Sequence, residues 1–219
     1  MDIYLKLRIG LNCFELLAAT VGFFYLKELR NGYWKFFPVY LAIVFLIEVT
    51  GEYTGYVLHA VQFNIALYRY FGIPFQYLFF CWLFWKYFQQ TDVAKWPLVG
   101  AAVYLVCCIV DIIHPIGTKA AFYSFSYMVG SIVLLALVLL FLFKFMRSEE
   151  ILFYRRSRMF WVATGLLVFY LLSLPLYGLW NTLVYDYPEV FNQYWMVTMV
   201  LDALMYLFFT FAFIWGKPR

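Results

Sequence analysis

The sequence predicts an all-α membrane protein, with seven transmembrane helices bundled into one domain over residues 1–219. Of its 219 residues, 66% are hydrophobic and 25% aromatic, and only 13% are charged. This composition lies far outside the range of soluble globular domains. Apolar stretches of about 20 residues, the length needed to cross a bilayer core, recur between charged or turn-forming residues. They leave almost no chain for a soluble domain.

The predicted spans cover residues 5–27, 36–58, 67–89, 96–114, 121–144, 158–181 and 191–215. The first span begins directly after "MDIYLKLR" and contains no small-residue cleavage site. We therefore expect it to be an uncleaved span and not a signal peptide. The four cysteines all fall within spans, at spacings that indicate neither a disulfide framework nor a metal-binding pair. They are expected to pack as small apolar residues.

The distribution of basic residues predicts the orientation of the chain. Lys and Arg are concentrated between spans one and two, three and four, and five and six, and at the C-terminus. The opposite side carries only Lys6, Arg8, Arg69 and Lys119. The positive-inside rule then places the N-terminus outside and the C-terminus in the cytoplasm. The net charge of +4 reflects this topology and does not indicate nucleic-acid binding.

Two connections between spans contain more than turn residues. The cytoplasmic segment "KFMRSEEILFYRRSRMF", residues 144–160, mixes basic and aromatic side chains. Its aromatic side chains fit the lipid headgroup level, and Arg155, Arg156 and Arg158 fit a docking surface for a cytoplasmic or membrane signalling partner. On the outer side, residues 180–195, "WNTLVYDYPEVFNQYW", are predicted to be a connection within an interfacial aromatic belt.

The second span carries acidic residues inside the apolar stretch "LIEVTGEYTGYVLHAV". Glu48, Glu52, Gly55 and His59 follow one another at i, i+4, i+7 and i+11, so one face of a single helix would hold all four. Gly51 and Gly55 form a small-xxx-small pair that allows another helix to approach closely. This face is predicted to point into the bundle.

Other spans repeat this pattern of polar residues at helical spacing. They contribute Asn12 and Glu15 with Ala19 and Gly22, then Asp111 and His114, and finally Thr198, Asp202 and Tyr206. The predicted orientation places these residues between the bilayer midplane and the outer surface. The cytoplasmic halves of the spans are apolar. The sequence therefore predicts a polar pocket that opens outward.

The buried carboxylates need an explanation, because a charged side chain at the bilayer centre costs roughly 2.5–3.5 kcal/mol. The sequence leaves three explanations open: neutral acids hydrogen-bonded across helices, a small polar or cationic ligand, and a metal ion. The predicted ligand-binding residues are Glu15, Glu48, Glu52, Asp111, His114, Asp202 and Tyr206. A divalent metal would use His59, His114, Glu52 and Asp111 at the outer rim.

Motifs of known chemistry are missing from the sequence. It contains no HExxH motif, Gly-rich phosphate loop or GxSxG elbow, and span seven has no lysine for a retinal Schiff base. No cofactor is therefore predicted beyond the possible metal. The sequence favours a non-enzymatic sensor or receptor-like protein, or a subunit of a membrane complex. The alternatives are a proton- or cation-coupled transporter, disfavoured by the apolar inner half, and a metal-dependent intramembrane lipid-modifying enzyme.

Short motifs resemble a family of small seven-helix membrane proteins common in Bacteroidota. The resemblance rests on "EVTGEYTG", on "YFGIPFQYLFF" and on Asp202 ahead of Tyr206. Where the family pattern often carries a glutamate in span three, this chain has Gln76, and Glu52 and His59 lie outside the pattern. The resemblance implies the seven-helix fold and a role for Glu48 at the bundle centre, and it implies no activity.

Overall fold

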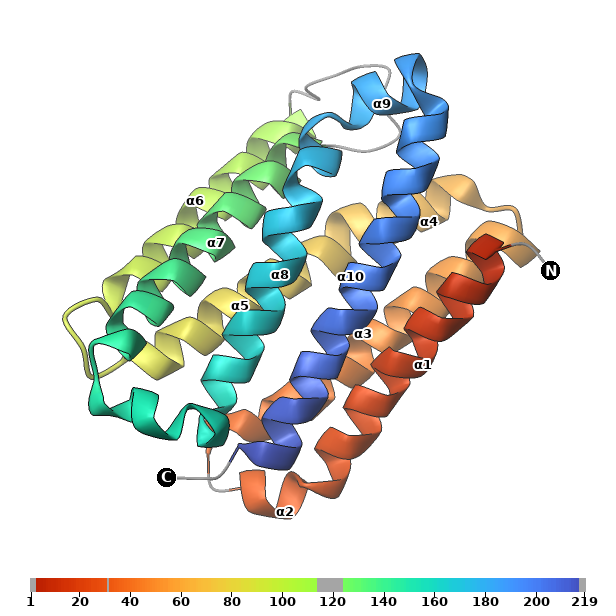
Figure 1. Ribbon diagram of the computed structural model, residues 1–219. Coiled ribbons are helices and arrows are strands. Elements are labelled where there is room, and N and C mark those ends of the chain that lie inside the picture. The colour runs from red at the N-terminus through yellow and green to blue at the C-terminus, as the bar shows by residue number, and fades with distance from the viewer. Residues whose placement is uncertain (1–2, 31, 114–123, 217–219) are drawn as a thin grey trace. The chain divides into compact units, whose positions relative to one another are not determined.

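The computed structural model describes residues 3–30, 32–113 and 124–216, which are almost entirely helical (Figure 1). No β-strand occurs within these ranges. A chain crossing hydrocarbon must satisfy its backbone N–H and C=O groups internally, and a helix does so within each segment. The all-α prediction is confirmed for this part of the chain.

Six helical segments of the described chain are long and apolar enough to cross a membrane. They correspond to α1 (Ile3–Phe24), α3 (Phe36–Glu52) with its flanking turns η1 (Tyr33–Lys35) and η2 (Tyr53–Val57), α6 (Lys95–Ile113), α7 (Ser124–Met146), α8 (Arg158–Gly178) and α10 (Pro188–Trp215). Each begins and ends within a few residues of a predicted span. The chain is therefore an integral membrane protein.

The remaining predicted span, 67–89, lies on a run of shorter helical pieces. Helix α4 (Val61–Leu67), the π-helical turn η3 (Tyr68–Gly72) and α5 (Ile73–Phe88) follow one another without a break. Helix α5 alone has 16 residues, which at 1.5 Å per residue gives about 24 Å, less than the roughly 30 Å bilayer core. The seven-span count depends on these three pieces crossing as one helix.

A tight turn joins the second predicted span to the third. After α3 the chain forms the π-helical turn η2 and then reverses over Leu58–Ala60, where Ala60 N–H donates to the carbonyl of Thr54 at 2.9 Å. His59 is exposed and has a φ of 50°, a left-handed conformation that histidine tolerates better than most residues. The prediction that His59 shares a helix face with Glu48 is wrong, because the α-helix ends before it.

The chain forms two compact units, which we describe separately. The terminal unit comprises Met1–Phe45, Leu135–Leu172 and Met196–Arg219, and the central unit comprises Leu46–Leu134 and Ser173–Trp195. The boundaries fall inside α3, α7, α8 and α10.

Small and aromatic residues pack the core of the terminal unit. The buried residues of α1 are Leu11, Glu15, Ala18, Ala19 and Gly22, which include most of the polar, small-residue face that the spacing predicts. A Cβ atom on Gly22 would lie 2.9 Å from the Phe213 ring and 3.0 Å from Cβ of Pro38. The ring of Phe37 packs against Phe213 at 5.4 Å between centroids. Helices α1, α3 and α10 therefore meet at van der Waals distance.

Tyr77 on α5 holds the core of the central unit together. It is 1% exposed, and its hydroxyl donates to the carbonyl of Tyr127 at 3.1 Å and bonds to Ser131 Oγ at 2.8 Å. Its ring packs on Tyr104 at 4.8 Å between centroids. A Cβ atom on Gly130 would lie 2.8 Å from this ring. Tyr77 thus links α5 to both α6 and α7.

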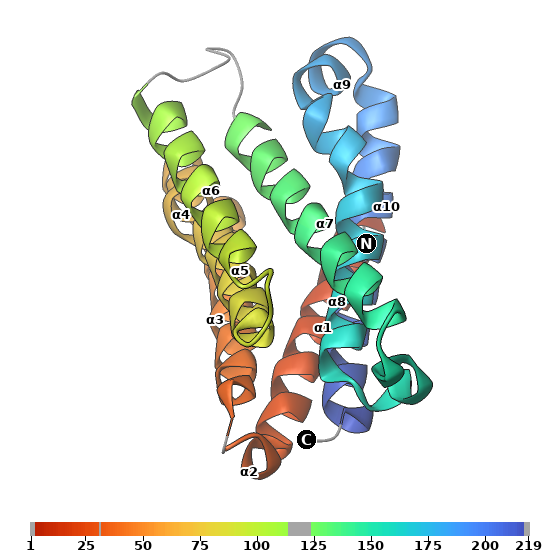
Figure 2. The same cartoon turned by 90° about the vertical axis from the view of Figure 1, so that its left-hand side faces the viewer.

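Residues 180–195, predicted to be an interfacial connection, join α8 to α10 and are themselves mostly helical. They form the short helix α9 (Trp180–Asp186), which lies between α8 and α10 in Figure 2, and the first turns of α10. Trp180 packs on Tyr177, Phe191 and Trp195, with ring centroids 5.8, 4.9 and 5.5 Å away. These aromatic contacts hold α9 in place, and the composition of the segment alone did not predict this helix.

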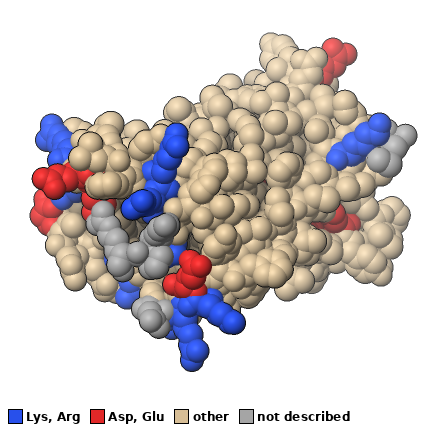
Figure 3. All heavy atoms as spheres, turned by 60° about the horizontal axis from the view of Figure 1, so that its bottom comes forward, with Lys and Arg blue, Asp and Glu red and all other residues tan. Residues whose placement is uncertain are grey.

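The exposed surface is largely apolar, as contact with lipid requires. On α6, Val103, Val106, Ile109 and Ile113 are 45%, 59%, 55% and 63% exposed. Most of the face shown in Figure 3 is uncharged, and the Lys, Arg, Asp and Glu side chains occupy small parts of it. Exposed apolar surface of this extent marks a partner, and here the bilayer is that partner.

Two glycine substitutions test the helix packing. Gly130→Ala should destabilise the protein by about 1–3 kcal/mol, because the new methyl group meets the fixed ring of Tyr77. Gly10→Ala is the matched control: nothing lies within 4 Å of its Cβ position, so alanine should be neutral or stabilising by up to about 1 kcal/mol. Thermal unfolding in detergent measures both. Equal effects of the two substitutions would contradict the packing around Tyr77.

Candidate functional site

Two acidic side chains and a tyrosine come together in the terminal unit. Glu15 on α1 is 1% exposed, Tyr40 on α3 is 2% exposed, and Asp202 on α10 is half-buried. Both carboxyl groups lie within electrostatic range of the Tyr40 hydroxyl. We call these three residues the Glu15–Tyr40–Asp202 cluster. It joins two acids that the sequence analysis placed on separate spans.

The neighbours of Asp202 on α10 continue the cluster as a buried stripe. Thr198 and Tyr206, four residues before and after Asp202, are 5% and 3% exposed. Thr210 Oγ donates to the carbonyl of Tyr206 at 2.9 Å, so one more polar group is satisfied within the helix. The spacing of Thr198, Asp202 and Tyr206 therefore predicts correctly that they lie on an inward face.

The helices that form the cluster carry cationic side chains only near their ends. The sequence has no Lys or Arg between Arg8 and Lys27, between Lys35 and Arg69, or between Arg158 and Lys217. A carboxylate in a medium of low dielectric constant favours a proton or another positive group beside it. The cluster is thus suited to bind positive charge.

In the central unit, Glu48 forms a bond between helices. The Tyr68 hydroxyl donates to Glu48 Oε2 at 2.6 Å, from η3 to α3. Gly51 makes room for this contact, because a Cβ atom there would lie 2.6 Å from Tyr68 Oη. Similarly, a Cβ atom on Gly55 would lie 2.7 Å from Asn64 Nδ2. The close approach predicted from Gly51 and Gly55 is confirmed, and Glu48 acts in holding the helices together.

Asp111 also has a structural role in the central unit. It is 2% exposed, and its Oδ2 accepts the backbone N–H of Ser126 at 2.8 Å. Ser126 lies in the first turn of α7, where backbone N–H groups have no partner within the helix. Arg69 Nη2 donates to the backbone carbonyl of Asp111 at 3.2 Å. Asp111 therefore caps α7 from the neighbouring helix.

The residues proposed for a metal site do not assemble one within the described ranges. His59 lies exposed in the turn after η2, Glu52 is half-buried on α3, and His114 lies outside the described residues. No group of three or more His, Cys, Asp or Glu side chains that could hold a metal ion occurs in the described part of the chain.

Six of the seven predicted ligand-binding residues are divided between the two units, and His114 lies outside the described residues. Glu15, Asp202 and Tyr206 belong to the terminal unit, and Glu48, Glu52 and Asp111 to the central unit. A single pocket lined by all of them remains a prediction. Tyr68 bonds to Glu48, and Tyr40 lies within electrostatic range of Glu15 and Asp202. Both tyrosines were missed because nothing in the sequence sets them apart from the other 18 of its 20 tyrosines.

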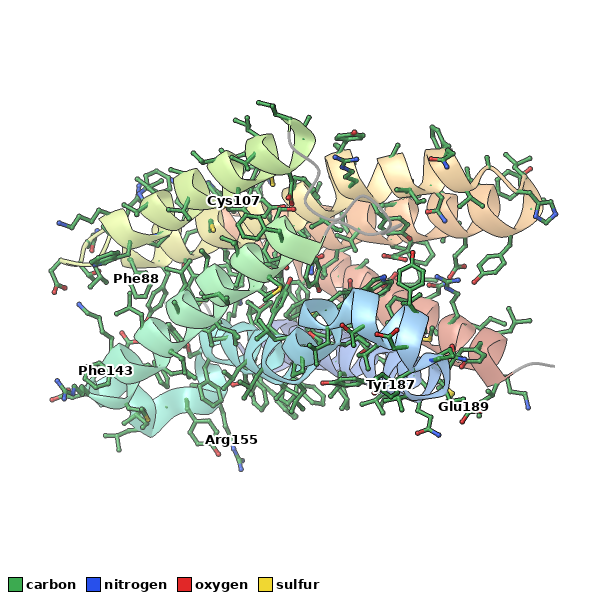
Figure 4. The ribbon with its side chains drawn as sticks, turned by 90° about the horizontal axis from the view of Figure 1, so that it is seen from above. Phe88, Cys107, Phe143, Arg155, Tyr187 and Glu189 are labelled. Atoms are coloured by element: carbon green, nitrogen blue, oxygen red, sulfur yellow. The ribbon has the colours of Figure 1, made fainter. Side chains whose placement is uncertain are left out.

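Two of the three arginines predicted to form a docking surface are exposed, and the third is buried. Arg155 and Arg156 are exposed at the end of η4 (Glu149–Arg156), and Figure 4 shows Arg155 pointing away from the helices. Arg158 is only 7% exposed, so it does not belong to an exposed docking surface. Sequence alone does not predict this difference, because all three arginines lie within four residues of one basic segment.

Comparison with known proteins identifies no relative. No family model, curated protein or solved structure matches the chain. The resemblance to the seven-helix family of Bacteroidota stays a prediction.

The contact between Tyr68 and Glu48 can be tested by removing one hydroxyl group. Tyr68→Phe should lower the free energy of unfolding by about 1–3 kcal/mol, because a carboxyl group between helices loses its hydrogen bond. Tyr53→Phe is the control, since Tyr53 is 54% exposed. Thermal unfolding of both variants, with and without Glu48→Gln, gives the coupling energy. Additive effects of Tyr68→Phe and Glu48→Gln would show that the bond contributes nothing.

Proposed function

We propose that the chain crosses the membrane seven times, with an outside N-terminus and a cytoplasmic C-terminus in a bacterial inner membrane. Six helices of spanning length and the unbroken run from Val61 to Phe88 support this count. The concentration of basic residues in alternate connections supports the orientation.

Cysteine labelling in intact cells tests whether the run from Val61 to Phe88 crosses the membrane. In a variant without the native cysteines, Leu58→Cys should react with a membrane-impermeant thiol reagent, and Thr91→Cys should react only after permeabilisation. Both positions are exposed, and they lie at opposite ends of the run from α4 to α5. Labelling of both from the same side would mean that this run does not cross the bilayer.

We propose further that the protein is a non-enzymatic receptor-like protein or complex subunit that binds a small amine at the Glu15–Tyr40–Asp202 cluster. The observation that carries this proposal is that two acids, one of them 1% exposed, lie within electrostatic range of a single buried tyrosine hydroxyl. A charged acid in the bilayer costs free energy unless it is paired. A cationic ligand would offset this cost for both acids together.

The chemistry of the cluster favours an ammonium group as the ligand. A primary ammonium group has three N–H donors, which match two carboxyl groups and one hydroxyl oxygen. The face of the Tyr40 ring adds a cation–π attraction for a group placed over it. The apolar core around the cluster, with Leu11 and Ala18 on α1 both buried, favours a ligand whose remaining part is small or apolar. The described residues are almost entirely in helices, so we propose that a signal passes to a partner.

Thermal unfolding of the purified protein with a panel of organic amines, amino acids and divalent ions tests this function. An amine that binds should raise the unfolding temperature, since ligand at 100 times its Kd adds about 2.7 kcal/mol of stability. Glu15→Gln and Asp202→Asn should abolish the shift.

Glu189→Gln is the matched control, because Glu189 is exposed at the start of α10 (Figure 4). It should keep the full response to the amine. If no amine stabilises the wild-type protein, or if the Glu15, Asp202 and Glu189 variants all respond alike, the proposed ligand site is wrong.

A further inference from the structure

Arg158 occupies an unusual position for a cationic side chain. It is the first residue of α8, directly after Ser157, whose Oγ accepts the N–H of Phe160 at 3.3 Å and so caps the helix. Long basic side chains at the end of a membrane helix normally extend to water. Arg158 instead is 7% exposed. Its guanidinium group therefore lies within the terminal unit.

One edge of this guanidinium group has no hydrogen-bond acceptor among the residues that the structure describes. Within the described residues, neither Nε nor Nη2 of Arg158 has a hydrogen-bond acceptor, although both atoms are buried. The N–H bonds of these two atoms lie side by side on one edge of the planar group. This edge binds the two oxygens of a carboxylate or phosphate in parallel. A buried cationic donor without an acceptor is costly, so we expect an oxyanion to complete it.

The surroundings of Arg158 hold its stem in place. A Cβ atom on Gly216, directly after α10, would collide with Cγ of Arg158 and lie 3.2 Å from its Cα. The end of α10 thus packs on the aliphatic part of Arg158, where only glycine leaves enough room. Glu28 on α2 (Leu26–Leu29) and Tyr33 lie within electrostatic range of the guanidinium group. The Glu28 side chain itself is exposed.

The site lies where one apolar helix begins and another ends. Helix α8 starts at Arg158 and α10 ends at Trp215, and the ends of membrane-spanning helices lie at the level of the lipid headgroups. Phosphate groups are the oxyanions present at this level. The exposed Arg155 and Arg156 in the preceding segment attract anions to the same end of α8.

We propose that the Nε–Nη2 edge of Arg158 binds a phosphate group, from a phospholipid headgroup or from a free phosphate ion. This site is separate from the Glu15–Tyr40–Asp202 cluster and does not depend on the proposed function. Arg158 recognises the phosphate by its fork of two donors, whereas Arg155 and Arg156 contribute charge alone.

The test uses the full-length protein purified in a phosphate-free detergent. Thermal unfolding is measured with inorganic phosphate, with a short-chain phosphatidylglycerol, and with a short-chain diacylglycerol as the phosphate-free control. We expect stabilisation by at least one phosphate compound and none by diacylglycerol. Stabilisation by inorganic phosphate identifies the free ion as a sufficient ligand, and stabilisation by phosphatidylglycerol alone identifies the headgroup; both results support the site.

Substitutions then test whether the phosphate binds to the paired Nε and Nη2 donors of Arg158. Arg158→Lys keeps the charge and loses the paired donors, so the apparent affinity should fall by about tenfold or more. Arg155→Lys, an exposed arginine in the same segment, should bind as the wild type does. Glu28→Gln should leave binding equal or stronger, because it removes a competing negative charge.

Three results would overturn the proposal. The first is a wild-type protein that neither phosphate compound stabilises, a result that does not depend on any variant folding. The second is equal binding by Arg158→Lys and Arg155→Lys, which would show that only charge matters. The third is a loss of stability in Glu28→Gln that does not add to the loss in Arg158→Lys when both substitutions are combined. Such coupling would show that Glu28 itself is the partner of the Arg158 donors.

Discussion

The structure depends on one constraint, the cost of leaving a polar group unsatisfied in hydrocarbon. Backbone groups meet this constraint by forming helices. Polar side chains meet it by finding partners on neighbouring helices, as Tyr68 does with Glu48 and Tyr77 with Ser131. Glycines such as Gly51 and Gly130 allow these partners to approach. The apolar surface that remains is exposed to lipid, where it needs no partner.

The same constraint separates the acidic residues into two kinds. Glu48 accepts a bond from Tyr68, and Asp111 Oδ2 accepts the N–H of Ser126 in the first turn of α7, so each acid is bonded to a neighbouring helical segment. Glu15 and Asp202 both lie within electrostatic range of the buried Tyr40 hydroxyl, where two acids together favour a positive group. Arg158 has the opposite charge, and two of its buried donor atoms have no acceptor within the described residues. The proposed ligands, an amine at the acidic cluster and a phosphate at Arg158, follow from these charges.

Hydropathy and helical spacing predicted most of the fold. The helix bounds follow the predicted spans closely, because span length is set by the bilayer and not by details of packing. Spacing also predicted the buried faces of α1 and α10. It failed at His59, because a π-helical turn breaks the period of 3.6 residues, and at α9, which forms through aromatic contacts of Trp180. It could not show that Arg158 is buried while Arg155 is exposed, since this depends on how Gly216 packs on Arg158.

The most direct test of the account is the protonation of Glu15 and Asp202 with and without a bound amine. Infrared difference spectroscopy detects the carbonyl band of a neutral carboxylic acid, and Glu15→Gln and Asp202→Asn assign it. The account predicts that a band from at least one of these acids is present in the free protein and disappears when an amine binds, because the ligand replaces the proton as the positive charge. A band that is unchanged at saturating amine would contradict it and would identify both acids as neutral structural residues.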